Sequence, residues 1–351
     1  MLGAKLNRTR GGLLQRLLGR PATDAFKLEQ GLAGRRRHGA CSLPTRVKLR
    51  TGHSLLLPMV EHAAMATPSI CSRDRNVAMV RPAVDHPRWR HEPMSAPSLD
   101  APQTAPPRYP PAPDGHTLYL VGDIHGRLDL LLRVQRQIDE DKARNDYTRT
   151  LEIYLGDYID RGSDSAGVVS RLIARAGEVD TAFLRGNHEQ LLLDFLQGSD
   201  CAEQWLGLGG TATLLSYGVA PRVLSREAPA DVIRSNLSKK LPHDHMRFYE
   251  ETGSYVRIGD YLAVHAGLRP GFRLEGQKTA DLLGIRHDFL DYEGDFGFIV
   301  IHGHTPVMAP ELRHNRINID TGAFATNRLT CLRIGADGAR ILQRDRRASD
   351  T

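Results

Sequence analysis

The sequence predicts an α/β fold in which a central β-sandwich of two mixed sheets is flanked by helices. Five short apolar runs each end at a glycine or a polar loop, as buried strands do. They span residues 117–121, 151–155, 181–184, 261–264 and 298–301. A helical pattern follows each of the first three runs, whereas strand pairs dominate after residue 254. Alternating strands and helices, followed by strand pairs, predict mixed sheets covered by helices.

Three amphipathic segments predict helices after the first three strands. They span residues 128–145, 165–179 and 188–198. Ser163 or Ser165 is a candidate N-cap of the second helix, and Gly198 is expected to end the third. Residues 199–254 then interrupt the alternation, and we expect a helical insert there that covers one side of the functional site.

The last third of the chain supplies further strands. We expect a hairpin over residues 255–264, then strands over 298–301, 316–320, 329–334 and 339–344. The last two strands are joined by an Ala-Asp-Gly turn, which is typical of a hairpin. No internal repeat is visible, so the sequence predicts one catalytic domain over residues 115–351.

Five polar motifs directly follow the five apolar runs, in a fixed order. They are GDIHGR (122–127), GDYIDRG (156–162), RGNHE (185–189), VHAG (264–267) and HGHT (302–305). In layered α/β folds, ligands bind where strands end and loops begin. We therefore expect these five loops to meet at one edge of the sheets and to form one site there.

The motifs supply six candidate metal ligands that offer oxygen or imidazole nitrogen and no thiolate. They are Asp123, His125, Asp157, Asn187, His265 and His304. Such a set suits Mn, Fe or Zn, and we expect two divalent ions, with Mn²⁺ preferred. Asp157 is positioned to place its carboxylate between the two ions. Two ions about 3.5–4 Å apart hold a phosphoryl group and generate hydroxide from bound water.

Four further residues fit the rest of a phosphate-cleaving reaction. Arg161 is a candidate phosphate-binding residue because a guanidinium forks onto phosphate oxygens, and Arg286 is a candidate second clamp. His188 is a candidate general acid, and Asp160 is expected to orient it and hold it charged. His302 is open to three interpretations: a direct role in the site, a partner of a metal ligand, or a structural histidine.

The order of these motifs resembles the phosphoprotein phosphatase branch of the calcineurin-like metallophosphoesterases, and most closely its compact bacterial and phage serine/threonine phosphatases. The resemblance covers about residues 115–345. It implies a four-layer fold with two metals in the site. Asp123, His125 and Asp157 would bind the first metal, with Asp157 bridging, and Asn187, His265 and His304 would complete the second.

Two positions depart from related patterns. Pro306 stands where other metallophosphoesterases often have a further histidine, which fits the phosphatase branch. Gly284 stands two residues before Arg286, where the resemblance leads us to expect tryptophan, and this weakens the local context of Arg286.

The sequence favours a metal-dependent hydrolase of phosphomonoesters, namely a phosphoprotein phosphatase acting on phosphoserine or phosphothreonine. The first alternative is a dinucleoside tetraphosphate hydrolase, which uses similar motifs; the DYIDRG and GNHE sequences favour the protein phosphatase. The second is a non-catalytic phosphate-binding or scaffold protein, which would require the loss of a ligand or of the acid. All of these residues are present.

Charge is unevenly distributed along the chain. Residues 1–100 carry 17 Lys or Arg and 7 Asp or Glu, a net charge of +10, whereas residues 101–351 carry 30 and 34, a net charge of −4. A mildly acidic catalytic domain argues against a nuclease that follows a phosphate backbone, so we expect no nucleic-acid partner. The four cysteines have no CxxC spacing, which suits a reducing, cytoplasmic compartment. We expect no membrane span and a monomer.

Residues 1–114 differ from the rest in being basic and rich in proline. A Pro-rich stretch at 101–115 predicts an extended or disordered linker, and we expect disorder before about residue 114. Residues 1–20 alternate Leu and Arg, which fits a transit peptide or a membrane-surface helix. A simpler interpretation is a start further along the chain, for which Met94 is the candidate.

Overall fold

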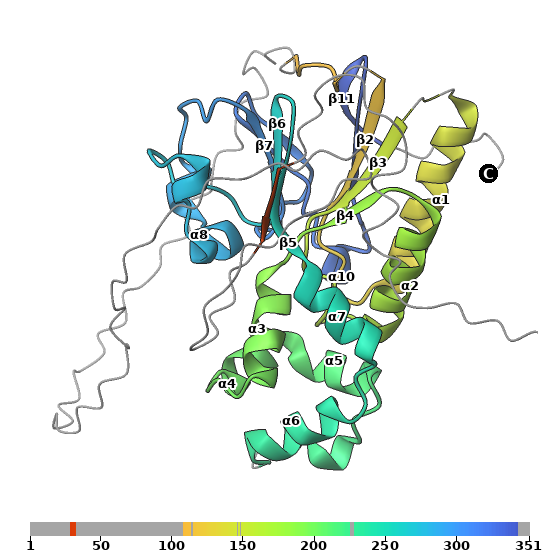
Figure 1. Ribbon diagram of the computed structural model, residues 1–351, viewed down its shortest axis with the longest axis vertical. Coiled ribbons are helices and arrows are strands. Elements are labelled where there is room, and N and C mark those ends of the chain that lie inside the picture. Colours follow the sequence, from red (N-terminus) through yellow and green to blue (C-terminus); the bar gives the residue numbers. More distant parts are fainter. Residues whose placement is uncertain are drawn as a thin grey trace, which may run out of the picture. The chain divides into compact units, whose positions relative to one another are not determined.

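The computed structural model describes residues 29–32, 108–113, 115–145, 147, 149–224 and 228–342. The predictions for residues 1–20, for the Pro-rich stretch at 101–107 and for an alternative start at Met94 lie outside the described residues. Figure 1 shows the strands side by side, with α1 and α2 on one side of them and α8 on the other.

The first sheet has the strand order β11-β10-β2-β3-β4. Its strands are β2 (His116–Val121), β3 (Arg149–Tyr154), β4 (Thr181–Phe183), β10 (Cys331–Gly335) and β11 (Gly338–Ile341). β2, β3 and β4 run parallel, whereas β10 is antiparallel to both β2 and β11. The sheet is therefore mixed, as the sequence predicts.

The second sheet has the order β1-β5-β6-β7-β9-β8. Its strands are β1 (Glu29–Leu32), β5 (Gly253–Ile258), β6 (Tyr261–Val264), β7 (Ile299–His302), β8 (Glu311–Leu312) and β9 (Arg316–Asn318). β6, β7 and β9 run parallel, and the other pairs are antiparallel. β5 and β6 form the predicted hairpin.

The two sheets pack face to face, and helices cover their outer faces. Along β2, Leu118 belongs to the core between the sheets, while its neighbour Tyr119 belongs to the core beneath the helices. Along β6, Ala263 faces the first sheet, while Leu262 packs with residues of the small helices on the far side. This period of two is that of a strand buried on both faces. The order of helices, sheet, sheet and helices confirms the predicted four-layer fold.

Ten α-helices lie within the described residues. They are α1 (Leu128–Arg144), α2 (Ser165–Glu178), α3 (Asn187–Leu196), α4 (Ala202–Trp205), α5 (Thr211–Ser216), α6 (Ala230–Ser238), α7 (His243–Glu251), α8 (Thr279–Gly284), α9 (His287–Leu290) and α10 (Ala323–Thr326). The N-cap predicted for α2 is wrong. Asp164 caps the helix by accepting from the Gly167 backbone N–H at 2.8 Å. Ser165 is instead buried and bonds to Thr213.

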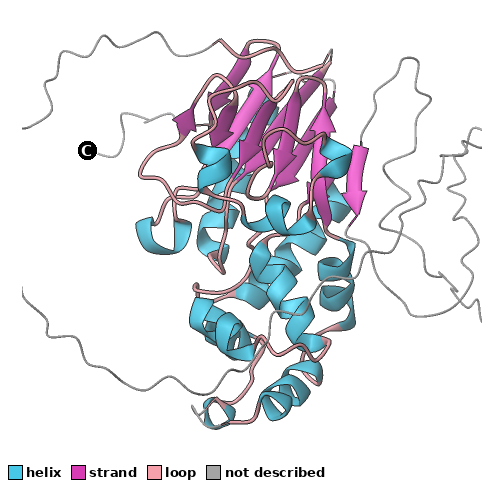
Figure 2. Cartoon of the chain, turned by 90° about the vertical axis from the view of Figure 1, so that its left-hand side faces the viewer, coloured by secondary structure: helices cyan, strands magenta, loops and turns pink. Residues whose placement is uncertain are grey.

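The predicted helical insert is present over residues 199–252. Helices α4 to α7 lie together with α3 at one end of the sheets (Figure 1), and Figure 2 shows the same grouping of helices from the side. Residues Leu206–Gly210 join α4 to α5 through a kink at Gly209, whose φ is +111°. This kink lies against Arg161 of the GDYIDRG loop, whose backbone N–H donates to the Gly209 carbonyl at 3.3 Å.

Part of the predicted N-terminal extension contacts the sheets. Besides β1, which pairs with β5, residues 108–113 pack on the catalytic domain, although the sequence places the domain boundary at residue 115. The Ala112 N–H donates to the Gly335 carbonyl at 2.9 Å, and Ala112 is buried between the sheets. The Tyr261 hydroxyl donates to the Pro110 carbonyl at 2.5 Å.

Candidate metal centre and active site

The five motif loops meet at the carboxyl ends of β2, β3, β4, β6 and β7, and hydrogen bonds join one loop to the next. The His125 backbone N–H donates to the Asp157 carbonyl at 2.8 Å, and the Gly303 N–H donates to the His265 carbonyl at 2.8 Å. The His304 backbone N–H donates to Asp123 Oδ2 at 3.0 Å, which ties the loops of the two sheets together. Loops far apart in sequence therefore form one rigid site.

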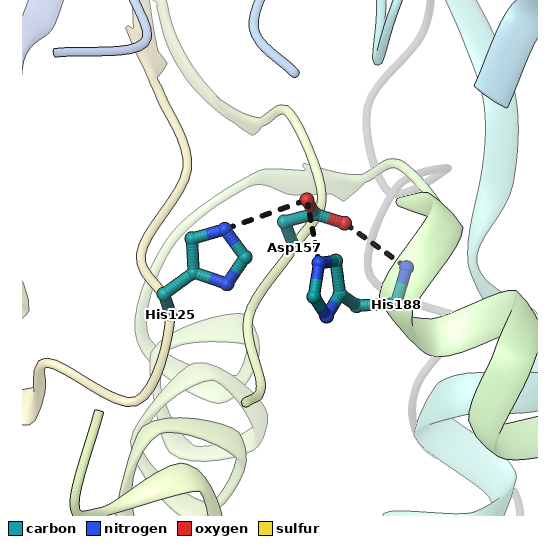
Figure 3. A group of neighbouring side chains, drawn as sticks. All are labelled: His125, Asp157 and His188. Atoms are coloured by element: carbon teal, nitrogen blue, oxygen red, sulfur yellow. Dashed lines mark hydrogen bonds and ion pairs between the residues drawn. The ribbon is translucent and has the colours of Figure 1, made fainter. Parts of the chain in front are cut away.

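The Asp157 carboxylate lies at the centre of this site. Its Oδ2 is 3.6 Å from His125 Nε2 and 3.8 Å from His188 Nε2, and its Oδ1 is 3.4 Å from His265 Nε2. Figure 3 shows His125 and His188 pointing at this carboxylate from different elements. Two groups of side chains lie close enough together to share one ion. The first is His125, Asp157 and His188, and the second is Asp157, His265 and His304. Asp157 belongs to both groups, which is the arrangement a bridging ligand requires.

The Asn187 side chain connects the histidines on the other side of the site. Its Oδ1 lies 3.1 Å from His265 Nε2 and 2.8 Å from His304 Nδ1. An amide oxygen and two imidazole nitrogens thus converge on one point. All three residue types are ligands for a divalent ion of the Mn, Fe or Zn kind.

Two histidines are held with one ring nitrogen free for a ligand. The Nδ1 atoms of His125 and His265 each lie 2.9 Å from a backbone carbonyl, those of Ile159 and Leu155. Donation of Nδ1–H to a carbonyl leaves the Nε2 lone pair available, as in many metal sites. Both Nε2 atoms point toward Asp157.

The donor set fits a pair of cations. Asp123 is almost fully buried, and its Oδ1 has no hydrogen-bond partner among the described residues. Burial and the neighbouring Asp320 and Asp157 charges raise the pKa of Asp123 well above its usual range. Burial likewise raises the pKa of Asp320 to about 6. Bound cations would compensate this concentration of buried carboxylates.

Glu189 fixes the loop that carries Asp157. Its buried carboxylate accepts backbone N–H bonds from Asp157 at 2.9 Å, Tyr158 at 2.8 Å and Gly186 at 2.9 Å. Burial raises the pKa of Glu189 to about 7, and the nearby Asp157 charge adds to the shift. Glu189 closes the GNHE motif, but its role was not evident from the sequence.

His188 and Asp160 form a closely bonded pair. Their Nδ1 and Oδ2 atoms are 2.6 Å apart, and both residues are buried. Trp205 Nε1–H donates to the same Oδ2 at 3.0 Å, and the Thr213 hydroxyl donates to Oδ1 at 2.6 Å. Burial disfavours the charged imidazole, but the Asp157 charge and the bond to Asp160 raise the pKa of His188 above its usual value.

The two candidate phosphate-binding arginines lie in different environments. Arg161 Nη2 is 3.3 Å from His188 Nε2, and its guanidinium carbon lies 4.7 Å from the centre of the Phe324 ring. Arg286 is exposed, and its Nη1 donates to the Thr305 hydroxyl at 3.1 Å, beside His304. Arg161 is therefore part of the buried cluster, whereas Arg286 lies at its rim.

Backbone strain is concentrated at this site. Six non-glycine residues of the described chain have positive φ, and five of them belong to the predicted site: His125, Asp157, Asp160, Arg161 and His304. This conformation costs about 1–3 kcal/mol per residue and persists where the surroundings impose it, often at active sites. The hydrogen bonds between the loops offset the cost of this conformation. The conformation in turn directs these side chains toward the centre of the site.

Two glycines leave room for the central carboxylates. A Cβ atom on Gly186 would lie 2.0 Å from Asp157 Oδ1, and one on Gly303 would lie 2.1 Å from Asp123 Oδ1. Both distances are far below van der Waals contact. Any side chain at either position would therefore displace a candidate ligand.

The structure brings together nine of the ten predicted site residues and places Arg286 at the rim. His302 is buried, packs edge-on against Phe289 at 4.9 Å and bonds through Nδ1 to the Gly303 carbonyl, which favours the structural role. Sequence reasoning missed four residues that hold the site: Glu189, Trp205, Thr213 and Asp320. Only Glu189 carried a signal, since it stands inside a motif.

The sequence profile of the calcineurin-like phosphoesterases matches residues 116–320. The chain belongs to this family. The match spans all five motifs and confirms the family resemblance drawn from them. It establishes a phosphoesterase of the hydrolase class.

Several relatives share one name. The asymmetrical bis(5'-nucleosyl)-tetraphosphatase PrpE of Oceanobacillus iheyensis is 29% identical over 236 residues, covering 61% of this chain and 87% of that protein. The enzyme of the same name from Bacillus velezensis is 30% identical over 237 residues, with coverages of 61% and 87%. A solved structure described as a putative diadenosine tetraphosphatase is 20% identical and has a TM-score of 0.41, covering 66% of this chain and 94% of that chain.

No helix in the described part of the chain is long and apolar enough to cross a bilayer.

Proposed function

We propose that this chain hydrolyses bis(5'-nucleosyl) tetraphosphates asymmetrically, releasing a nucleoside monophosphate and a nucleoside triphosphate. The observation that carries the proposal is sequence similarity to relatives that have this activity in their name. The similarity extends over 87% of the length of the Oceanobacillus iheyensis and Bacillus velezensis proteins. This was the alternative in the sequence analysis, and the relatives favour it over the protein phosphatase.

The candidate ligands divide into two sets that share one residue. Asp123, His125 and Asp157 would hold the first ion, and Asp157, Asn187, His265 and His304 the second, with Mn²⁺ the preferred metal. When bound, two such ions polarise the phosphoryl group and supply a nucleophile from water. Asp157 reaches both sets because His125 lies near one of its oxygens and His265 near the other.

The remaining residues act on the phosphate and on the leaving group. Arg161 would bind phosphate oxygens beside His188, and Arg286 would bind the polyphosphate chain at the rim. As water oxygen bonds to phosphorus, the bond from phosphorus to the leaving oxygen breaks. His188 Nε2–H would donate its proton to that oxygen, while Asp160 holds the ring through Nδ1.

Protein phosphatase activity on phosphoserine or phosphothreonine is the second candidate. The GDYIDRG and GNHE motifs favour it, and a two-metal site recognises phosphate more than the group attached to it. The two functions differ in the bond cleaved, a phosphoanhydride in one and an alkyl phosphoester in the other.

A comparison of substrates on the purified full chain tests the proposal. With Mn²⁺ present, we expect kcat/KM for diadenosine tetraphosphate to exceed that for phosphoserine and phosphothreonine peptides, with AMP and ATP as the separated products. An Asp157→Asn variant purified in parallel controls for contaminating phosphatases. A higher kcat/KM on the phosphopeptides would reject the proposal in favour of the second candidate.

A further inference from the structure

A pocket of about 540 Å³ lies beside the rim of the active site, and neither the motifs nor the reaction accounts for it. Its lining comes from two segments, the loop after β6 and the stretch around α9. They contribute Arg269, Phe272, His287, Asp288, Asp291 and Tyr292 to the lining. It is a shallow hollow that is largely open to solvent.

The pocket adjoins the predicted phosphate-binding residues through Arg286. His287, which lines the pocket, directly follows Arg286 in the chain. The Arg286 guanidinium in turn contacts Thr305, the neighbour of the candidate ligand His304. A substrate with its phosphates bound at Arg286 would therefore have this pocket near its next group.

The wall formed by the loop after β6 is held in place without a ligand. Gln277 bonds to both the N–H and the carbonyl of Arg269, at 2.8 and 2.9 Å, and to the carbonyl of Phe272 at 3.1 Å. Arg269 then pairs with Asp281 and Asp288, each at 2.7 Å, which ties the loop to α8 and α9. The pocket is thus preformed, which lowers the cost of binding.

The chemistry of the lining suits an aromatic, uncharged group. Phe272 is 59% exposed, so its ring is accessible to a ligand. The Tyr292 ring packs on Phe296 with centres 4.9 Å apart. Arg269 already pairs with Asp288, so its charge is not free to attract a phosphate. The Asp291 side chain is 77% exposed; its Oδ2 lies 3.7 Å from His287 Nδ1, which leaves Oδ1 to accept from hydroxyl or amino groups.

We propose that this pocket binds a nucleoside of the substrate, with the base stacked on Phe272 and Asp291 accepting hydrogen bonds from ribose hydroxyls or a base amino group. The proposal rests on the proposed function and deepens it by assigning a nucleoside site. Aromatic side chains bind bases by stacking, and this is tolerant of base identity.

A second pocket of about 600 Å³ is a weaker candidate for the nucleoside. Among its lining residues are Asp200, Glu203 and Leu208, and no aromatic side chain is present. It therefore offers no ring on which a base could stack.

The test compares Phe272→Ala with wild type on substrates with and without a nucleoside. We expect the KM for diadenosine tetraphosphate to rise about 5-fold to 100-fold, as for loss of one stacked base, with little change in kcat. The KM for p-nitrophenyl phosphate should stay unchanged. Phe272→Tyr should keep the wild-type KM, and Val232→Ala, which trims an exposed apolar side chain on α6, serves as the matched control.

Binding of adenosine, measured by saturation-transfer NMR, gives a readout independent of turnover. Wild type should transfer saturation to the adenine protons, and Phe272→Ala should not. An unchanged KM for diadenosine tetraphosphate in Phe272→Ala, or an equal rise for phosphopeptides, would overturn the nucleoside site. If wild type cleaves only phosphopeptides, the proposed function fails. In that case the adenosine NMR signal decides on the nucleoside site: a signal that Phe272→Ala abolishes supports it, and the absence of a signal in wild type rejects it.

Discussion

The Nδ1 atom of His188 lies 2.6 Å from Oδ2 of Asp160, and that carboxylate is itself held from two further directions. Trp205 and Thr213 donate to its two oxygens, so Asp160 has little freedom to rotate. The imidazole is consequently fixed in one orientation, with Nε2 directed toward Asp157 and Arg161. A proton on that nitrogen is in place for a leaving oxygen.

Replacing the general acid should affect substrates according to their leaving group. His188→Asn should slow hydrolysis of a phosphoserine peptide by about 10²–10⁴-fold, because an alkoxide needs a proton to depart. Nitrophenyl phosphate should lose much less, since its aryl oxide leaves unprotonated. Metal content measured by elemental analysis should stay at the wild-type value. Equal losses on both substrates, or loss of metal, would show that His188 is not the acid.

Neutralising the central carboxylate should remove metal. Asp157→Asn takes away the charge between the two histidine groups, and we expect loss of bound Mn²⁺ and of nearly all turnover with the fold retained. Elemental analysis, steady-state rates and circular dichroism measure the three effects. A variant that keeps two ions and a normal rate would refute the bridging role of Asp157.

Chelation should abolish hydrolysis. The six candidate ligands offer only oxygen and nitrogen donors, so EDTA should remove the ions and added Mn²⁺ should restore the rate. Mg²⁺ added at the same concentration serves as the comparison, since it accepts imidazole ligands poorly. Undiminished activity in a preparation shown to be metal-free would contradict the proposed site.

Much of the fold and site was predictable because the signals are local. Each of the five strands ends within two residues of the start of its motif. The positions of the apolar runs therefore indicated that nine site residues would meet at one edge of the sheets. Trp205 and Thr213 were not predictable, because they lie 45 and 53 residues from Asp160 and meet it only through the packing of the insert. β8 has only two residues, and the β1 sequence EQGL lacks the apolar run that marks the other strands.

Loosening the support of Asp160 should imitate a partial loss of the acid. Thr213→Val removes the hydroxyl that donates to Oδ1 and accepts from the Asp160 N–H, which should cost about 1–3 kcal/mol of stability. The rate on alkyl phosphates should fall more than the rate on nitrophenyl phosphate. Thr211→Val, an exposed position on the same helix, is the control. A loss of stability with unchanged substrate selectivity would limit Thr213 to a structural role.

Two truncations should separate the contribution of residues 108–114 from that of the rest of the extension. Both variants, starting at Arg108 and at Gly115, lack β1, so their difference reports residues 108–114 alone. The shorter chain loses the bonds of Tyr109 to the Arg313 carbonyl, of Tyr261 to Pro110 and of Ala112 to Gly335. At about 0.5–1.5 kcal/mol for each bond, its Tm should be about 3–18 °C lower. Both variants should keep their rate on nitrophenyl phosphate, because none of these residues contacts the site. Equal Tm values, measured by differential scanning calorimetry, would show that the contacts of residues 108–113 do not stabilise the domain.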